Sequence, residues 1–208
     1  MFPTMDKCIV ISLGGSLIAP HLSDDGGVDV QFLKKFRTFI VGEIKKGKRF
    51  IIVAGGGKTA RVYQKAASQV SKASSDDLDW IGIAATKLNA HLLLSMLRAE
   101  AYPQVIDHKP SGKELLDLQK SKKNVYIVSG WYPGQSTDHE AVYLAREFGA
   151  QEVINASNIA FAYDKDPKKY KDAKPIRKIS WREYRKLIPQ EWIPGLSTPI
   201  DPVTAKLA

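Results

Sequence analysis

The chain has 208 residues, of which 44% are hydrophobic and 25% are charged. This size and composition fit one globular domain, or two small lobes that share a core, and exclude a disordered or collagen-like chain. Its single cysteine, Cys8, excludes an internal disulfide and a zinc site built from several cysteines, so we expect a reducing, cytoplasmic environment. The formal net charge of +9 indicates a polyanionic partner, which could be nucleic acid, a membrane surface or a small phosphorylated substrate.

The first half of the chain alternates between predicted strands and helices. Continuous apolar runs over 8–13 and 50–54 predict two strands that are buried on both faces. Between them, apolar residues at helical spacing over 32–44 predict a helix, and the three segments together form a βαβ unit. We expect two further helices, one that begins near Lys58 and one over about 79–98, with a polar loop over 71–77 between them.

The second half continues this alternation. We expect, in chain order, strands over 105–106 and 125–128, a helix from 137 or 138 to 148, a short strand at 153–154 and a late helix that starts at a capping box of Ser180 and Glu183. Strands that alternate with helices form parallel sheets with helices on both faces. The predicted fold class is therefore α/β, a three-layer α/β/α sandwich around a mostly parallel sheet.

Three of the predicted strands end in loops that contain glycine. Gly14 and Gly15 follow the first strand, the triple glycine 55–57 follows the second, and the loop 129–136 follows a third. Ligands gather at the carboxyl ends of parallel strands, and glycine lets backbone N–H groups approach an anion closely, so these loops predict a phosphate-binding edge. A plain turn remains the alternative interpretation of each loop taken alone.

The triple glycine does not form a Walker A motif. That motif needs a glycine five residues before Gly57, where this chain has Ile52. P-loop NTPases are therefore excluded. What remains is a glycine turn before a helix whose first turn presents Lys58 and Arg61, so that an anion would meet helix N–H groups and two cations together.

Other polar residues allow two interpretations. Asp138, at the start of a predicted helix, could cap that helix or orient a cation such as Mg²⁺ among phosphates. None of the four histidines has a partner at metal-ligand or triad spacing. The basic run over 168–178 carries much of the net charge, and we interpret it as solvated surface.

Six short motifs follow one another over nearly the whole chain. They are ISLGGSL at 11–17, VAGGGKTAR at 53–61, DWIGI at 79–83 with NA at 89–90, PGQSTD at 133–138, N at 158 with YDKDPKKY at 163–170, and IDP at 200–202 with AK at 205–206. In this order they resemble the motifs of the amino acid kinase superfamily, in particular of the archaeal-type uridylate (UMP) kinases. The resemblance implies an amino acid kinase fold, a homo-oligomer that is a hexamer in the family, and no membrane partner.

The resemblance also implies how the chain is organised. It predicts a single amino acid kinase domain over 1–208, with an acceptor-binding half over about 1–128 and an ATP-binding half over about 129–208. Relative to the family, we expect the C-terminus to be short.

Carried over by position, the resemblance implies the residues of the site. On the ATP side, it places Gly14, Gly15, Ser16, Gly57 and Arg61 along the phosphates, and Ser157, Asn158, Tyr163 and Asp166 in the nucleotide pocket. On the UMP side, it places Gly56, Asp79, Gly130, Trp131, Tyr132, Pro133, Gly134, Gln135, Ser136 and Thr137, with Asp79 at the ribose. The implied catalytic residues are Lys58, Asp138 and Lys206, and Mg²⁺ arrives with ATP without a direct protein ligand.

The implied reaction transfers the γ-phosphoryl group of ATP to UMP and gives UDP and ADP. Because its transition state is loose and rich in negative charge, alignment and positive charge supply most of the catalysis. The UMP phosphate is already ionised near neutral pH, so no dedicated base is needed. Mg²⁺ would screen the two polyanions, and Lys58 and Lys206 would stabilise the transition state.

The chain departs from the family pattern at three places. Ser12 stands where many members of the superfamily have a lysine. Trp131 stands where the family has a threonine, and its indole would either stack on the base or partly occlude the nucleotide site. Ala160 and Phe161 replace an Asp-Gly pair, so the turn in the ATP pocket has to form differently.

Other functions stay open on the sequence. An isopentenyl phosphate kinase would show a histidine soon after the triple glycine, where this chain has Lys-Thr-Ala-Arg over 58–61. Acetylglutamate and carbamate kinases fit less well the loop over 130–137, which the resemblance assigns to the acceptor. The changes at Trp131 and at 160–161 could mark a catalytically silent nucleotide-binding or regulatory protein. A nucleic-acid binder would need an aromatic-basic module, which the sequence lacks.

Overall fold

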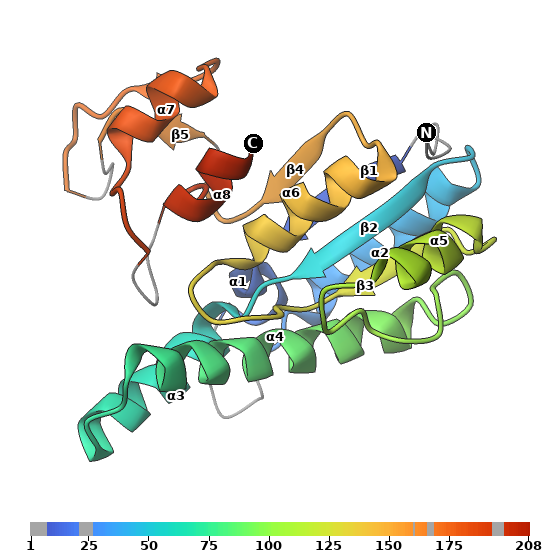
Figure 1. The fold of residues 1–208 in the computed structure, drawn as a ribbon, viewed down its shortest axis with the longest axis horizontal. Helices are drawn as coiled ribbons and strands as arrows, with labels where there is room; N and C mark the ends of the chain where they lie inside the picture. Colours follow the sequence, from blue (N-terminus) through green and yellow to red (C-terminus); the bar gives the residue numbers. More distant parts are fainter. Residues whose placement is uncertain (1–7, 21–26, 160, 166–168, 193–197) are drawn as a thin grey trace.

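The computed structural model describes residues 8–20, 27–159, 161–165, 169–192 and 198–208 (Figure 1). Asp166, which is predicted in the ATP pocket, lies outside these ranges. Within them the elements are, in chain order, β1 (Cys8–Leu13), α1 (Gly15–Ile18), α2 (Val30–Ile44), β2 (Arg49–Ala54), α3 (Gly57–Val70), α4 (Ser75–Met96), α5 (Gly112–Lys120), β3 (Val125–Val128), α6 (Thr137–Phe148), β4 (Val153–Ala156), β5 (Ala162–Tyr163), β6 (Pro175–Ile176), α7 (Trp181–Leu187) and α8 (Pro202–Leu207).

Four strands form one parallel sheet in the order β3-β2-β1-β4. β1 pairs with both of its neighbours, so that Leu13, Ala54 and Ala156 stand side by side at the carboxyl edge. β2 pairs with β3 in the same direction. The loops that follow all four strands therefore leave the sheet at one edge, where the predicted phosphate-binding loops come together.

Helices cover both faces of this sheet (Figure 1). Along β2, Ile51 and Val53 pack toward α5 and α6, whereas Phe50, Ile52 and Ala54 pack toward α2 and α4. A strand that is buried on both faces is apolar at every position, which explains the continuous apolar run in its sequence. The structure confirms the predicted three-layer α/β/α sandwich. No helix in the described ranges is long and apolar enough to cross a membrane.

Three elements differ from the sequence-based prediction. α4 begins at Ser75 rather than near residue 79, because Ser74 and Asp77 form a capping box within a polar stretch that was predicted to be a loop. The strand predicted over 105–106 is an isolated bridge between Ile106 and Val128. α5 has no counterpart among the predicted elements, although a capping box begins it at Ser111.

The C-terminal segment forms a small lobe of α7, α8 and the antiparallel pair β5–β6. Figure 1 shows this lobe near the end of the sheet toward which the strands run. Inside it, the Tyr184 hydroxyl exchanges two hydrogen bonds with the backbone of Ile200, at 2.8 and 2.9 Å. One carboxylate oxygen of Asp201 caps α8, and the other accepts a hydrogen bond from the Ser136 hydroxyl at 2.5 Å. Asp201 therefore fixes the lobe to the loop that leads into α6.

Candidate active site

The loops after β1 and β2 lie directly against each other. A Cβ atom added to Gly15 would stand 2.3 Å from the Gly55 carbonyl oxygen, and one added to Gly57 would stand 2.2 Å from the Gly15 carbonyl carbon. Gly57 also has a positive φ of +63°, a conformation that favours glycine. The two loops are therefore interlocked through their backbones, which a pair of independent turns would not require.

Positive charge gathers where these loops meet. α3 begins at Gly57 and has no acidic residue in its first turn, so its N-terminal N–H groups keep their partial positive charge. The Arg61 guanidinium donates a hydrogen bond to the Ser16 hydroxyl at 2.8 Å, which joins α3 to the first loop. Lys58 lies one residue into the same helix. The arrangement suits an anion such as a phosphate.

A cavity of about 190 Å³ opens beside the second glycine loop. It is lined by Gly56, Gly57, Ala60, Arg61, Gln64, Asp79, Gly82, Ile83, Thr86, Gly130, Tyr132, Gln135, Ser136, Thr137, Glu140 and Trp192. Most of the residues predicted on the UMP side are therefore brought together here. The predicted residues Trp131, Pro133 and Gly134 do not line it, whereas Trp192 and Glu140 line it without having been predicted. We call this space the acceptor cavity.

Asp79 is buried one turn inside α4 rather than at its first residue. Its Oδ2 atom accepts hydrogen bonds from the Gly134 backbone N–H at 2.7 Å and from the Trp192 indole N–H at 3.1 Å. Its Oδ1 atom has no hydrogen bond among the described residues, so it is available to a ligand hydroxyl. No local signal could have pointed to Trp192, because it reaches Asp79 across 113 positions of the chain.

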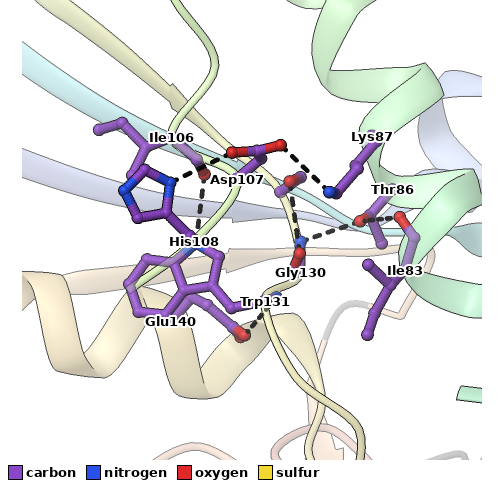
Figure 2. Close-up of polar contacts among 10 residues, drawn as sticks. Ile83, Thr86, Lys87, Ile106, Asp107, His108, Gly130, Trp131 and Glu140 are labelled. Carbon is purple, nitrogen blue, oxygen red and sulfur yellow. Dashed lines mark hydrogen bonds and ion pairs between the residues drawn. The ribbon is translucent and has the colours of Figure 1, made fainter. Parts of the chain in front are cut away.

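Trp131 corrects a prediction. Its side chain is 4% exposed and belongs to the core beneath α6, where its ring packs edge-on against Tyr143. Its indole N–H donates to the Ile106 carbonyl oxygen at 3.2 Å. Figure 2 shows the indole on the opposite side of the loop from Ile83 and Thr86, which line the acceptor cavity. The indole therefore neither stacks on a ligand in that cavity nor occludes it.

We expect Trp131→Ala to lower the free energy of unfolding by about 3–5 kcal/mol, because it leaves a hole in a packed core. Urea denaturation measures this loss, with Trp80→Ala as the control, since Trp80 is 52% exposed on α4. A variant that keeps its stability and changes only nucleotide affinity would show that the indole belongs to the ligand site after all.

A second cavity of about 540 Å³ lies between the sheet edge and the C-terminal lobe. It is lined by Ser12, Gly14, Thr137, Asp138, Asn155, Ser157, Asn158, Ile159, Phe161, Tyr163, Asp164, Lys165, Tyr184, Leu187, Ile188, Thr198 and Pro199. It thus brings together Gly14, Ser157, Asn158 and Tyr163, as predicted for the ATP side. Gly57 and Arg61 were predicted on that side as well, but they line the acceptor cavity, because α3 carries them away from the donor cavity, and Gly15 and Ser16 line neither cavity. Phe161, which departs from the family pattern, forms part of its wall beneath the Arg177 guanidinium. We call this space the donor cavity.

Asp138 is partly buried at the donor cavity, two residues after Ser136. Its Oδ1 atom accepts a hydrogen bond from the Ser12 hydroxyl at 2.6 Å. Burial is the main cause that raises the pKa of Asp138 to about 6; the nearby Asp201 carboxylate contributes to the rise, and the Ser12 hydrogen bond opposes it. Ser136 has one hydroxyl proton, and its 2.5 Å contact shows that it donates to Asp201, so its 3.4 Å contact with Asp138 is weak.

The donor cavity fits a magnesium ion that enters with a nucleotide. In the part of the chain that the structure describes, no three His, Cys, Asp or Glu side chains form a cluster that could hold a metal. Mg²⁺ usually combines one or two carboxylates with substrate phosphates and water. The partly buried carboxylate of Asp138 fits this coordination preference, and we expect it to orient the water shell of the ion.

The two predicted catalytic lysines are placed differently. Lys58 lies in the first turn of α3, beside the interlocked glycine loops, although it is not among the residues that line either cavity. Lys206 is exposed on α8, and its ammonium group contacts the Gln190 carbonyl oxygen at 3.4 Å. The structure does not bring Lys206 to the wall of either cavity, because Asp201 fixes the direction of the short helix that carries it.

Comparisons with known proteins agree with this geometry. Residues 7–208 match the amino acid kinase family. The chain is 35% identical to the uridylate kinase of Staphylothermus marinus, covering 95% of this chain and 82% of the relative, and 34% identical to that of Pyrococcus abyssi, covering 96% and 84%.

Solved structures give the same result. The uridylate kinase of Archaeoglobus fulgidus superposes with a TM-score of 0.74 at 32% identity, covering 96% of this chain and 84% of that one. The UMP kinase of Bacillus anthracis superposes with a TM-score of 0.73 at 21% identity, covering 97% and 82%, and supports the fold alone. The chain belongs to the amino acid kinase family and, within it, is similar to the archaeal uridylate kinases.

Proposed function

We propose that the protein is a UMP kinase, which transfers the γ-phosphoryl group of ATP to UMP and releases UDP and ADP. The observation that carries the proposal is the pair of cavities at one sheet edge, both of them lined by Thr137. Two nucleotides bound in these cavities would bring their phosphates toward the interlocked glycine loops. The names of the similar archaeal proteins support UMP as the acceptor.

The acceptor cavity offers one group for each polar part of UMP. Gly56, Gly57 and Arg61 suit the phosphate, because backbone N–H groups and a guanidinium bind phosphate oxygens well. The free Oδ1 atom of Asp79 suits a ribose hydroxyl. At about 190 Å³ the cavity is smaller than the roughly 300–1,000 Å³ of most ligand pockets. Trp192 forms one wall, so we infer that it moves outward when UMP enters.

The donor cavity suits ATP. Its volume of about 540 Å³ lies within the usual range of ligand pockets, roughly 300–1,000 Å³. Ser157 and Asn158 supply polar groups to it, and Phe161 and Tyr163 supply flat apolar surface for a purine ring. Asp138 and Gly14 stand at the end near the sheet, where the phosphates would reach the glycine loops.

Catalysis would rest on alignment and charge. The two glycine loops hold the reacting groups close, and Arg61 and Lys58 offset the negative charge that spreads over the phosphoryl oxygens in the loose transition state. Mg²⁺, when bound with ATP, supplies further charge neutralisation. No side chain has to take a proton from the acceptor phosphate.

The acceptor-binding half, over about 1–128, and the ATP-binding half, over about 129–208, both contribute residues to the site. Gly56, Gly57 and Asp79 precede the boundary near residue 128, and Ser157 and Asn158 follow it. The loop 130–137 comes after the boundary and still lines the acceptor cavity.

We propose that the protein is cytoplasmic and forms a homo-oligomer. The family resemblance supports both parts of this proposal, and the exposed apolar side chains of α3 and α4 support the oligomer.

An ADP-release assay with UMP, CMP, dTMP, AMP, isopentenyl phosphate and small acids tests the function. We expect UMP to give the highest kcat/KM, and Arg61→Ala to lower turnover about tenfold or more. Arg146→Ala, an exposed substitution on α6 outside both cavities, is the control and should stay near the wild-type rate. ATP binding without turnover of any acceptor would overturn the proposal and would indicate a silent nucleotide-binding protein.

A further inference from the structure

The acceptor cavity contains a buried carboxyl group that the proposed chemistry does not use. Glu140, in the first turn of α6, is 1% exposed and lines this cavity. Its Oε1 atom accepts hydrogen bonds from the Trp131 backbone N–H and from the Gln135 side-chain amide, both at 3.1 Å. Its Oε2 atom is buried and has no hydrogen-bond partner among the described residues. A buried polar atom without a partner costs free energy, and such an atom at a cavity wall points to a ligand.

The neighbouring polar groups are already satisfied. The Thr86 hydroxyl donates to the Ile83 carbonyl oxygen at 2.7 Å and accepts from the Gly130 backbone N–H at 2.9 Å. Figure 2 shows these residues around the loop that also carries Trp131, whose backbone N–H contacts Glu140 of α6. Of the described side chains that line the acceptor cavity, Glu140 is the one with a buried unpaired atom. Its Oε2 atom therefore remains available to a bound molecule.

The position of Glu140 assigns it to one part of the acceptor. If UMP binds as proposed above, Gly57 and Arg61 hold the phosphate and Asp79 holds the ribose. The remaining wall includes Ile83, Gly130 and Glu140, beside polar residues such as Gln64 and Gln135. Apolar surface with a few polar groups that fix orientation is the usual wall for a planar base, and Glu140 supplies a buried atom of this kind that is still unpaired.

We propose that Glu140 recognises the pyrimidine base, with its Oε2 atom accepting the N3–H of uracil. The proposal rests on the proposed UMP kinase function. Uracil carries a donor at N3, whereas cytosine carries a lone pair there, which would face the lone pairs of Oε2. The Trp131 and Gln135 donors occupy Oε1, so they hold the carboxyl group in one orientation and leave a single atom for the base. Glu140 would thereby distinguish UMP from CMP.

Two variants and a control test this role. Glu140→Gln keeps an oxygen that can accept the two donors at Oε1 and replaces the accepting Oε2 atom with an N–H donor. Glu140→Val removes the polar group altogether. Glu147→Gln changes a carboxylate on the same helix outside both cavities. For each protein, kcat and KM are measured with UMP and with CMP at fixed MgATP and about pH 8, because burial raises the pKa of Glu140 to about 7 and only the ionised carboxylate accepts the N3–H. Folding is checked by thermal melting.

We expect Glu140→Gln to lower the ratio of kcat/KM for UMP to that for CMP about tenfold or more, mainly through a higher KM for UMP. CMP should become a better substrate, because the new N–H meets its N3 lone pair. Glu140→Val should lower the same ratio without improving CMP. The KM for ATP should stay unchanged, and Glu147→Gln should match the wild type.

The outcomes separate the two proposals. If the wild-type protein turns over UMP and Glu140→Gln keeps the wild-type ratio, Glu140 does not recognise the base and only this inference fails. An equal loss with both acceptors would show that Glu140 only supports the loop, and would overturn it as well. If the wild-type protein turns over neither UMP nor CMP, the proposed function fails and this inference fails with it. If Glu140→Val does not fold, the ratio of kcat/KM for UMP to that for CMP in Glu140→Gln alone decides whether Glu140 recognises the base.

Discussion

Asp138→Asn should slow phosphoryl transfer about tenfold or more and at the same time stabilise the protein near neutral pH. The first effect follows from the loss of a negative charge at the wall of the donor cavity, where the proposed function puts the ATP phosphates and their cation. The second follows from burial, which raises the pKa of Asp138 to about 6 from an ordinary value of 3.8. If Asp138 acts as proposed, its ionised carboxylate therefore supports phosphoryl transfer and at the same time destabilises the folded protein.

The pH dependence of this stability has a definite sign. Between about pH 4 and pH 6 the unfolded chain loses the Asp138 proton first, so the free energy of unfolding falls as the pH rises. A difference of about two pKa units corresponds to at most about 3 kcal/mol. We therefore expect Asp138→Asn to raise the free energy of unfolding by about 1–3 kcal/mol above pH 7, and to leave it unchanged below about pH 4.

Urea denaturation at both pH values measures this difference, with Asp117→Asn on the exposed face of α5 as the control. An equal gain at both pH values would show that the effect does not come from ionisation. A rate close to that of the wild type would remove Asp138 from the proposed machinery.

Gly57→Ala should damage both folding and activity far more than Gly47→Ala. Both glycines have a positive φ, of +63° at Gly57 and +83° at Gly47, so each alanine carries a similar backbone strain of about 1 kcal/mol. At Gly47 the added Cβ meets nothing within 4 Å, whereas at Gly57 it lies 2.2 Å from the Gly15 carbonyl carbon. Gly57→Ala must therefore also push the two phosphate loops apart.

We expect Gly57→Ala to lower the free energy of unfolding by about 2–4 kcal/mol and kcat/KM by about a hundredfold, because small misplacements of reacting groups are costly. Gly47→Ala should lose about 1 kcal/mol and keep its activity. Urea denaturation and the ADP-release assay measure both. Equal effects of the two substitutions would mean that the contact between the loops contributes nothing beyond backbone strain.

Much of the fold was predictable because its signals are local. β1 and β2 are continuous apolar runs, and only a sheet covered on both faces buries such runs completely. Helix boundaries were harder to predict from the sequence. The polar stretch before Asp79 suggested a loop by composition, yet Ser74 and Asp77 satisfy backbone groups at the start of α4 and extend the helix into that stretch.

The site was predictable only in part, for a similar reason. The glycine loops and Asp138 have local patterns that predict them. No local pattern predicts the direction of the Trp131 side chain, because a loop side chain can turn to either side. Here its contacts with Tyr143 and the Ile106 carbonyl oxygen decide the direction. Trp192 reaches Asp79 only through the packing of the C-terminal lobe.

The sequence did not predict Glu140 as a site residue, for a different reason. An acidic residue near the start of a helix ordinarily complements the helix dipole and lies in solvent. Only the structure shows that this one is 1% exposed, that burial raises its pKa to about 7, and that it lines a cavity.

The most direct test of the proposed function follows the phosphoryl group itself. The wild-type protein is mixed with Mg²⁺, UMP and ATP that carries a radioactive γ-phosphate, and the nucleotides are separated by chromatography. A UMP kinase should move the label into the β-phosphate of UDP, and the transfer should need both UMP and the protein. Tight binding of ATP with the label remaining in ATP, or released only as inorganic phosphate, would contradict the proposed function.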